Sequence, residues 1–195
     1  MQKALFVLKS FCTHYRNIDF VDQMIEKKVK LGFSGSTGEG SCTSLAFRGN
    51  FTHSIDSKAR VSLPSDFRKV LEAHEEKKIV LTNYISDGSR CVEGFALSAW
   101  REFEEKLKAK SRFNPKIQKL ENFYLSRSAE CSIDGSGRIL IPQHLREYAG
   151  LEKEVTFTSS IHGFRIWDKR VWEHIFSAAE QALLENPEIF ADVDI

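Results

Sequence analysis

One ten-residue motif occurs twice in this chain, and this repeat limits what the chain can fold into. Residues 55–64 read IDSKARVSLP and residues 133–142 read IDGSGRILIP, and the two copies align without a gap. The identities continue outward, because Arg68 matches Arg146. Further along, the Gly-Phe pair at 94–95 is repeated at 163–164. A repeat of this kind predicts two copies of one structural unit.

Each copy is expected to fold as a β-hairpin followed by a short helix. An extended run, 51–55 or 129–133, enters a tight turn, and a β-branched run, 61–63 or 139–141, leaves it and stops at a proline. The remaining expected elements are short helices over 65–71 and 143–149, strands over 78–83, 94–97, 154–159 and 163–167, and longer helices capped by Ser98, Asn114 and Asp168.

The turn in each copy is expected to depend on an aspartate and on a residue with positive φ. Asp56 and Asp134 are interpreted as structural residues whose carboxylates accept backbone N–H bonds. Gly137 suits a backbone with positive φ, whereas Ala59 occupies the same place in the first copy. Because alanine at positive φ costs about 1 to 2 kcal/mol, the first turn is expected to be strained or differently shaped.

The predicted fold class is α+β, mainly β-hairpins with flanking helices. The predicted organisation is an N-terminal extension that is disordered or not native (1–45), a first domain (47–97), a helical connector (98–126), a second domain (127–172), and a C-terminal helix with an acidic tail (173–195).

Further segments complete a pattern around the two turns. They are FRGNF at 47–51, Asp56-x-Lys58-x-Arg60 with Pro64, Asp134-Gly135-x-Gly137-Arg138 with Pro142, AGL at 149–151, and WD at 167–168. With these segments the chain resembles the MraZ family of bacterial transcriptional regulators, from residue 47 to residue 181. Two copies of the turn motif at this spacing make the resemblance specific, and residues 1–44 have no counterpart in it.

The resemblance implies two SpoVT-AbrB-type domains, a tandem pseudo-repeat in which swapped hairpins build a β-barrel unit. It implies a DNA-binding repressor of the division and cell-wall gene cluster that its own gene heads. The implied target is a set of short G-rich boxes repeated in the promoter. The implied partners are double-stranded DNA and further copies of the chain in a homo-oligomeric ring. The implied location is the cytoplasm, at the nucleoid.

Local charge assigns the DNA-binding face chiefly to the first copy. The net charge of the whole chain is only +1, so affinity for nucleic acid has to come from local patches or from assembly. Five basic residues stand against two acidic ones over 47–69, whereas the numbers over 127–146 are three and two. In addition, Ser136 of the second copy replaces Lys58 of the first.

The candidate DNA-binding residues are Lys58 and Arg60 in the first turn, Arg48 in the entering strand, and Arg138 in the second turn. Arginine pairs bidentately with guanine edges, and lysine more readily meets phosphates. A second interpretation stays open, in which each turn arginine only pairs with the aspartate of its own turn, an exposed ion pair worth about 0 to 1 kcal/mol.

No pattern in the chain predicts an enzyme, a metal site or a cofactor. The four cysteines, Cys12, Cys42, Cys91 and Cys131, form no C-x-x-C pair, so isolated buried thiols are favoured. The histidines are scattered and have no acid or base at motif spacing. The apolar run 4–8 is too short for a signal peptide or a membrane span, so no membrane partner is expected.

Two functions from different classes therefore remain. The leading one is a sequence-specific DNA-binding repressor. The alternative is an oligomeric scaffold or protein-interaction module whose basic turns only keep it soluble. The two differ in the salt dependence of DNA binding, because neutralising phosphates makes affinity fall steeply with salt.

Three interpretations of residues 1–44 stay open. Asp19 is expected to cap a short helix, and a Gly/Ser/Thr-rich linker follows over 34–44. In the first interpretation Leu45 is the initiator, and the Ser-Gly and Thr-Gly codons at 34–35 and 37–38 spell operator boxes 9 bases apart, near one duplex turn. The others are an ordinary disordered extension and a functional extra helix.

Overall fold

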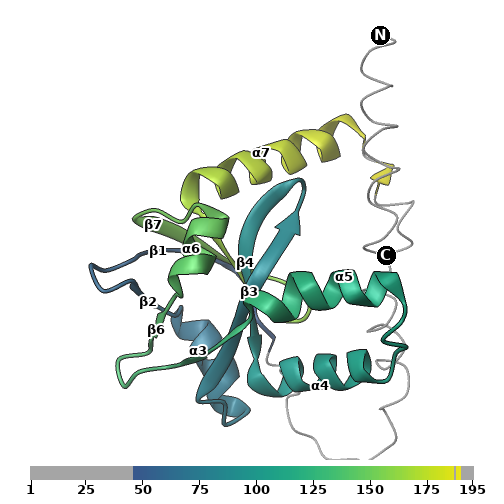
Figure 1. Ribbon diagram of the computed structural model, residues 1–195. Coiled ribbons are helices and arrows are strands. Elements are labelled where there is room, and N and C mark those ends of the chain that lie inside the picture. Colours follow the sequence, from purple (N-terminus) through teal and green to yellow (C-terminus); the bar gives the residue numbers. More distant parts are fainter. Residues whose placement is uncertain (1–45, 187, 190–195) are drawn as a thin grey trace, which may run out of the picture. The chain divides into compact units, whose positions relative to one another are not determined.

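In the computed structural model, which describes residues 46–186, 188 and 189, the two copies of the motif exchange strands (Figure 1). The first copy supplies β1 (Asn50–Ser54), β2 (Arg60–Ser62), α3 (Ser65–Ala73), β3 (Lys78–Ser86) and β4 (Ser89–Ala96). The second copy supplies β5 (Ala129–Ser132), β6 (Arg138–Leu140), α6 (Gln143–Ala149), β7 (Glu154–Ser159) and β8 (Phe164–Asp168). Three further elements connect the copies, α4 (Leu97–Lys108), α5 (Pro115–Tyr124) and the 3-10 turn η1 (Leu125–Arg127), and α7 (Lys169–Glu185) follows the second.

The described strands form a six-stranded antiparallel sheet in the order β1-β7-β8-β4-β3-β5, and a separate two-stranded ribbon of β2 and β6. The first strand of each copy therefore pairs with the third strand of the other copy, β1 with β7 and β5 with β3. The second strands pair with each other, with Val61 opposite Ile139. The mixed α+β class is confirmed, and it is mostly an antiparallel sheet with flanking helices.

The predicted hairpins are wrong in their strand pairing. Two backbone bonds close the turn in each copy. In the first turn the Asp56 N–H donates to the Arg60 carbonyl at 2.8 Å and the Ala59 N–H to the Asp56 carbonyl at 2.9 Å, and the equivalent bonds in the second turn are 2.9 Å and 2.8 Å long. Beyond these bonds the two strands separate and pair with the other copy. The physical reason is that β2 and β6 are only three residues long and are followed by a proline, which cannot donate a hydrogen bond to a neighbouring strand. Burial of the apolar residue of each strand in a core shared by both copies stabilises the fold more than a short local hairpin would.

One hydrophobic cluster joins the two copies. Equivalent residues of both copies are buried in it, namely Val61 with Ile139, Leu63 with Ile141, and Phe67 with Leu145. The ring of Phe67 also packs on Phe47, Phe51, Phe157 and Phe164 at centroid distances of 5.3 to 6.3 Å. Burying each such side chain stabilises the fold by about 1.5–3 kcal/mol. Because both copies contribute to this core, each copy depends on the other for the burial of its apolar side chains.

Two of the three longer helices, α4, α5 and α7, begin at the expected cap residue. Asn114 accepts the Lys116 N–H at 2.9 Å and Asp168 accepts the Arg170 N–H at 3.1 Å, as expected. Ser98 is not a cap, because α4 begins at Leu97 and the Ser98 N–H is bound by the carboxylate of Glu76 at 2.9 Å.

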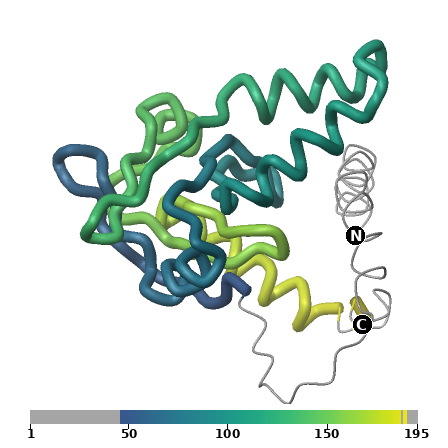
Figure 2. The backbone as a smooth tube through the Cα atoms, turned by 90° about the horizontal axis from the view of Figure 1, so that it is seen from below, coloured from purple at the N-terminus to yellow at the C-terminus, as the bar shows by residue number. Residues whose placement is uncertain are grey.

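The α4–α5 pair and α7 extend away from the sheet in both views (Figures 1 and 2). Within the described residues no helix combines the length and the apolar character that a membrane crossing needs. The expected extension over 1–45 and the last residues of the acidic tail lie outside the described residues.

The repeated Gly-Phe pairs mark a close approach between β4 and β8. Gly94 lies opposite Phe164 in the sheet register, and a Cβ on Gly94 would overlap the Phe164 ring, whose Cε1 atom would be only 2.9 Å away. A Cβ on Gly163 would overlap the Gly94 carbonyl. The glycines therefore allow the strands that meet at the centre of the sheet, one from each copy, to carry a buried ring between them.

We expect Gly94→Ala to lower the free energy of unfolding by about 1–3 kcal/mol, because the ring of Phe164 is fully enclosed and has little room to move. Urea unfolding followed by circular dichroism measures the effect. Gly135→Ala is the matched control, because no atom lies within 4 Å of its Cβ position and its φ is not positive. An equal loss in both variants would contradict the assignment.

Candidate nucleic-acid interface

The first turn is organised around the carboxylate of Asp56. Its Oδ1 accepts the backbone N–H groups of Lys58 at 2.8 Å and Arg60 at 2.9 Å. Its Oδ2 binds the guanidinium of Arg60, with Nε at 2.9 Å and Nη2 at 2.7 Å. The backbone N–H of Arg60 and then its side chain hold the pKa of the Asp56 carboxyl down at about 2.

The second turn repeats this geometry. Asp134 Oδ1 accepts the N–H groups of Ser136 and Arg138, both at 2.9 Å, and Oδ2 binds Arg138 Nε at 2.9 Å and Nη2 at 2.8 Å. The backbone N–H of Arg138, and then its side chain, lower the pKa of the Asp134 carboxyl. The aspartate–arginine ion pair, which was one of the two interpretations of the sequence, is thus present in both turns.

Each turn is fastened to the other copy by one backbone bond. The Ile141 N–H donates to the Ala59 carbonyl at 3.1 Å, and the Leu63 N–H donates to the Gly137 carbonyl at 2.9 Å. Both turn residues have positive φ, 61° at Ala59 and 72° at Gly137. The two turns therefore hold the two ends of the β2–β6 ribbon, and they project from the same side of the molecule in Figures 1 and 2.

The candidate cations are not all brought together. Lys58 is exposed at the first turn, and the side chains of Arg60 and Arg138 are 30% and 33% exposed. Arg48 is exposed at the far end of β1, eight residues from Asp56, which is on the order of 25 Å of extended chain. The first turn thus joins two of the predicted DNA-binding residues, and Arg48 stands apart from them.

The structure adds Arg68, which the sequence analysis did not select, to the second turn. The Arg68 side chain comes from α3 of the first copy and lies on Gly137, where a Cβ would be 2.5 Å from its Cδ. The only sequence signal was its match with Arg146, which does not reveal the contact. Arg146 lies differently, because its Nε donates to the Ile141 carbonyl at 3.1 Å.

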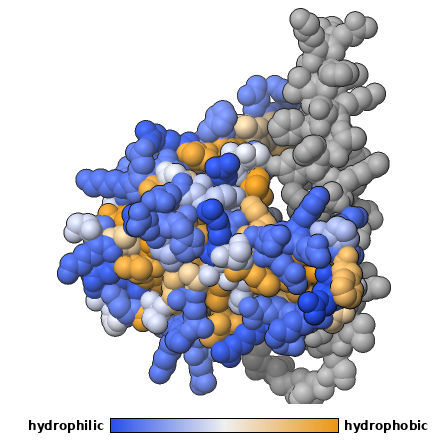
Figure 3. All heavy atoms as spheres, viewed as in Figure 1, coloured by the Kyte–Doolittle hydropathy of each residue, from blue (hydrophilic) through white to orange (hydrophobic). Residues whose placement is uncertain are grey.

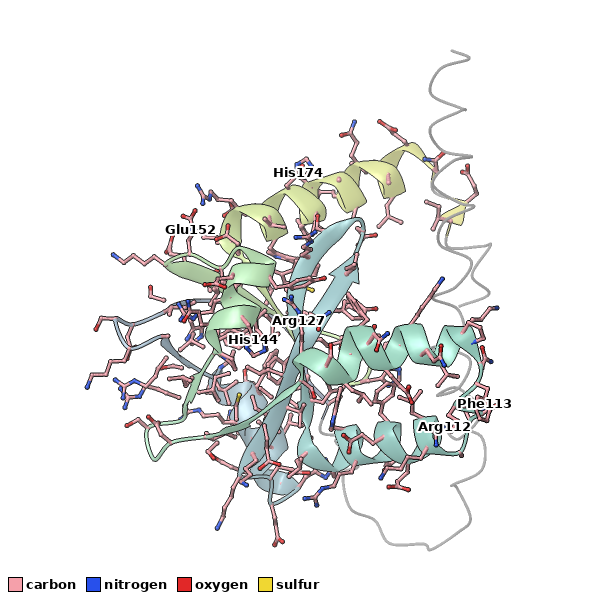
Figure 4. The ribbon with its side chains drawn as sticks, viewed as in Figure 1. Arg112, Phe113, Arg127, His144, Glu152 and His174 are labelled. Atoms are coloured by element: carbon pink, nitrogen blue, oxygen red, sulfur yellow. The ribbon has the colours of Figure 1, made fainter. Side chains whose placement is uncertain are left out.

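Other polar groups are used within the fold. A pocket of about 450 Å³ lies between the start of β7 and the start of α7, but Glu152 and Glu154 on its wall pair with Arg170 and Lys169 at 2.6 Å and 3.2 Å. His144 Nε2 lies 3.0 Å from the Arg127 carbonyl, and both residues face the viewer near the centre of Figure 4. No group of three metal-ligating side chains comes together within the described residues.

The two cysteines in the described part are free and buried, as expected. Burial raises the pKa of the Cys131 thiol to about 11 and raises that of Cys91 further above its usual range. Neither thiol has the thiolate character of a nucleophile at neutral pH.

The face of the molecule shown in Figure 3 is mostly hydrophilic, with hydrophobic residues in small groups.

Comparison with known proteins identifies related chains. The family model described as "MraZ protein, putative antitoxin-like" matches residues 46–123 and 125–191. A protein named transcriptional regulator MraZ from Caldanaerobacter subterraneus is 37% identical over 140 residues, which is 72% of this chain and 93% of the relative. Proteins with the same name from Nitrosomonas eutropha and Pseudomonas putida are 38% identical over 127 residues (65% and 84%) and 32% identical over 146 residues (75% and 95%).

Two interlocked copies of one unit, each with a turn held by an aspartate–arginine pair, define a two-repeat α+β protein. The family match covers both copies with a break only at residue 124, the last residue of α5. The chain belongs to the MraZ family. Because this is a family of transcriptional regulators, the chain is not an enzyme, which agrees with the sequence analysis.

We expect Ala59→Gly to raise the free energy of unfolding by about 0.5–1 kcal/mol. Glycine removes the steric cost of positive φ, and its larger entropy in the unfolded chain offsets part of the gain. Urea unfolding measures the difference. Glu75→Gly, at another non-glycine residue with positive φ (55°), is a comparison that touches neither turn. A loss of stability in Ala59→Gly would show that the alanine is not strained.

The lowered pKa of Asp56 predicts an acid-sensitive first turn. Its folded pKa of about 2 lies below the usual value near 3.9, so the pair stabilises the fold fully above about pH 4, and that stabilisation is lost as the pH falls through about 2. The difference in urea midpoint between the wild-type chain and Asp56→Asn should be constant above pH 5 and narrow below pH 4. A difference that stays constant down to pH 2 contradicts this assignment.

Proposed function

We propose that this chain is a sequence-specific DNA-binding transcriptional regulator, a repressor that acts on G-rich boxes repeated in the promoter of its own division and cell-wall operon. The observation that carries the proposal is the projection of two arginine-bearing turns from one side of a core that both copies share. Relatives named as transcriptional regulators support it. The chain would act in the cytoplasm, at the nucleoid.

The ion pairs orient the arginines for base recognition. Asp56 and Asp134 bind the edge of each guanidinium formed by Nε and Nη2. The opposite edge, formed by Nη1 and the second hydrogen of Nη2, is the one that presents two parallel donors to the O6 and N7 atoms of guanine. An arginine held in this way loses less rotamer entropy on binding, so Arg60 reads a base while its aspartate stays in place.

Lys58 has the complementary role. It is exposed two residues after Asp56, and a lysine ammonium is a compact point charge suited to a phosphate oxygen. The second turn has Ser136 at this place, which carries no charge. We therefore keep the first turn as the main DNA contact, with Lys58 and Arg60 as its contact residues, Arg48 as a contact just before β1 and Arg138 as a weaker contact.

We further propose that the strand exchange is the intramolecular form of a SpoVT-AbrB swapped hairpin, with 47–97 and 127–172 as the two domains. Because one chain has a net charge of only +1, several chains in a homo-oligomeric ring would supply enough basic turns for repeated boxes. Light scattering at micromolar concentration tests this assembly, and a monomer contradicts it.

The alternative function, a scaffold or protein-interaction module, predicts a different response to salt. DNA binding through phosphates gives a steep linear fall of log K with log salt, whereas a protein interface responds weakly. The test is fluorescence anisotropy on a duplex from the region upstream of the chain's own coding sequence, at three salt concentrations, with a mixed-sequence duplex for comparison. A wild-type chain that binds neither duplex supports the alternative.

We expect Lys58→Ala to weaken binding to both duplexes and to reduce the slope of log K against log salt by about 0.9 for each lysine in contact with a phosphate. The fold should be unaffected, because the side chain is exposed. Lys119→Ala is the matched control, since Lys119 is exposed on α5, away from the turns. Equal slopes for the two variants would remove Lys58 from the interface.

We expect Arg60→Ala to cost about 1–3 kcal/mol of binding free energy on the upstream duplex, and less on the mixed-sequence duplex. Arg138→Ala should cost less on the upstream duplex. The two residues are held alike by their aspartates, so a difference between them measures DNA contact and not turn stability. Equal losses, or none, would contradict the assignment of the main contact to the first turn.

A further inference from the structure

The two turns differ most in the arginine that lies against them. Arg68 crosses from α3 of the first copy onto Gly137 of the second turn, and its guanidinium occupies the space where a Cβ would be. The equivalent place in the first turn is filled by the Cβ of Ala59. Its counterpart Arg146 donates instead to the Ile141 carbonyl. The two copies therefore differ in the contact that this arginine makes.

Arg68 has no partner for its charge within the described residues. Its Nε is buried without a hydrogen bond, and no carboxylate or carbonyl binds its terminal amino groups. The nearby acids are already paired, since Asp134 holds Arg138 and Asp66 on α3 holds Lys69 at 2.8 Å. Arg60, Arg138 and Arg146 each have a partner for Nε, so Arg68 alone among these four does not.

A second observation places the positive charge of Arg68 close to a neighbouring element. His53 on β1 has a lowered pKa, first because of its partial burial and then because of the positive charge of Arg68. The positive charge of the half-buried Arg68 side chain on α3 thus lowers the pKa of a histidine on a different element. Leaving such a group without an anion costs free energy, and a bound anion would recover it.

The second turn lacks a cation of its own at the place where the first turn has Lys58. Arg68 supplies that cation from the other copy, and its side chain lies against Gly137, the residue directly before β6 begins at Arg138. The terminal amino groups of a planar guanidinium match the geometry of a phosphate oxygen pair.

We propose that Arg68 and the second turn form a phosphate-binding position for the backbone of duplex DNA, so that the first turn reads bases and the second holds the strand. This inference rests on the proposed function. Gly137 is then needed for two reasons, its positive φ and the space that Arg68 occupies.

The test measures DNA affinity and its salt dependence for Arg68→Gln, Arg68→Lys and Gly137→Ala. Arg68→Gln should weaken binding to the upstream and mixed-sequence duplexes by the same factor, several-fold, and reduce the salt slope by about 0.9 for each Arg68 in contact. Arg68→Lys should keep most of the slope. Gly137→Ala keeps the charge but displaces the guanidinium, and should lower affinity while the fold tolerates it, as it tolerates Ala59.

Two control variants are matched to Arg68→Gln. Arg146→Gln removes the repeat counterpart, whose Nε is already bound. Arg112→Gln removes an exposed cation that lies over the Phe113 ring at the tip of the α4–α5 pair, on the opposite side from the turns (Figure 4). Both should keep the wild-type slope. Urea unfolding of every variant separates binding from stability.

The outcomes distinguish this inference from the proposed function. If the wild-type chain binds and Arg68→Gln has the wild-type affinity and slope, the phosphate position is overturned and the proposed function stands. A lower urea midpoint with an unchanged slope shows that Arg68 only braces the turn, and also overturns it. A wild-type chain that binds no duplex overturns both.

Discussion

The pairing of β2 with β6 is the contact on which the rest of the structure depends. It joins three residues of each copy, and the bonds from Ile141 to Ala59 and from Leu63 to Gly137 extend it into the turns. Each short strand brings one fully buried residue, Val61 or Ile139, into the common core. Because β1 and β5 also pair only with the other copy, neither copy holds its first two strands without its partner. Two copies in one chain keep that partner at high effective concentration.

The same interlocking allows the two turns to diverge. A turn that is fastened at both ends keeps its shape when one residue changes, so the first copy retains alanine at a φ of 61°. In the second turn Gly137 leaves open the space that the α3 arginine occupies, whereas the α6 arginine donates to a carbonyl. The two half-buried arginines therefore differ in their contacts, because Arg146 Nε donates to the Ile141 carbonyl and Arg68 Nε has no hydrogen bond within the described residues. We infer that a symmetric fold gains two unlike contact surfaces in this way.

Local features of the fold could be predicted from the sequence, and pairing partners could not. The helix 143–149, the strand 154–159 and the caps Asn114 and Asp168 follow from residue pattern and cap chemistry, which act over a few residues. The hairpin prediction failed because a turn motif reports only that the chain reverses, and β1 meets β7 about a hundred residues away. Phe176 follows Trp172 by four residues, and their rings pack at a centroid distance of 6.0 Å, yet Phe176 is 54% exposed. In the candidate site, the aspartate–arginine pairs were visible as an i, i+4 pattern, whereas Arg68 was not, since its contact lies on the other copy.

Electrostatics explains why a turn built this way needs both kinds of cation. The charge of Arg60 is largely compensated by Asp56, so the pair adds little to the long-range attraction between the chain and DNA. The ion pair instead orients the arginine side chain, because the carboxylate fixes the plane of the guanidinium before DNA binds. In the proposed interface, the attraction that salt screens would come from cations outside these ion pairs, Lys58 on one turn and Arg68 on the other. Loss of an uncompensated cation should therefore change affinity for every sequence by the same factor, whereas loss of a paired arginine should change the ratio between sequences.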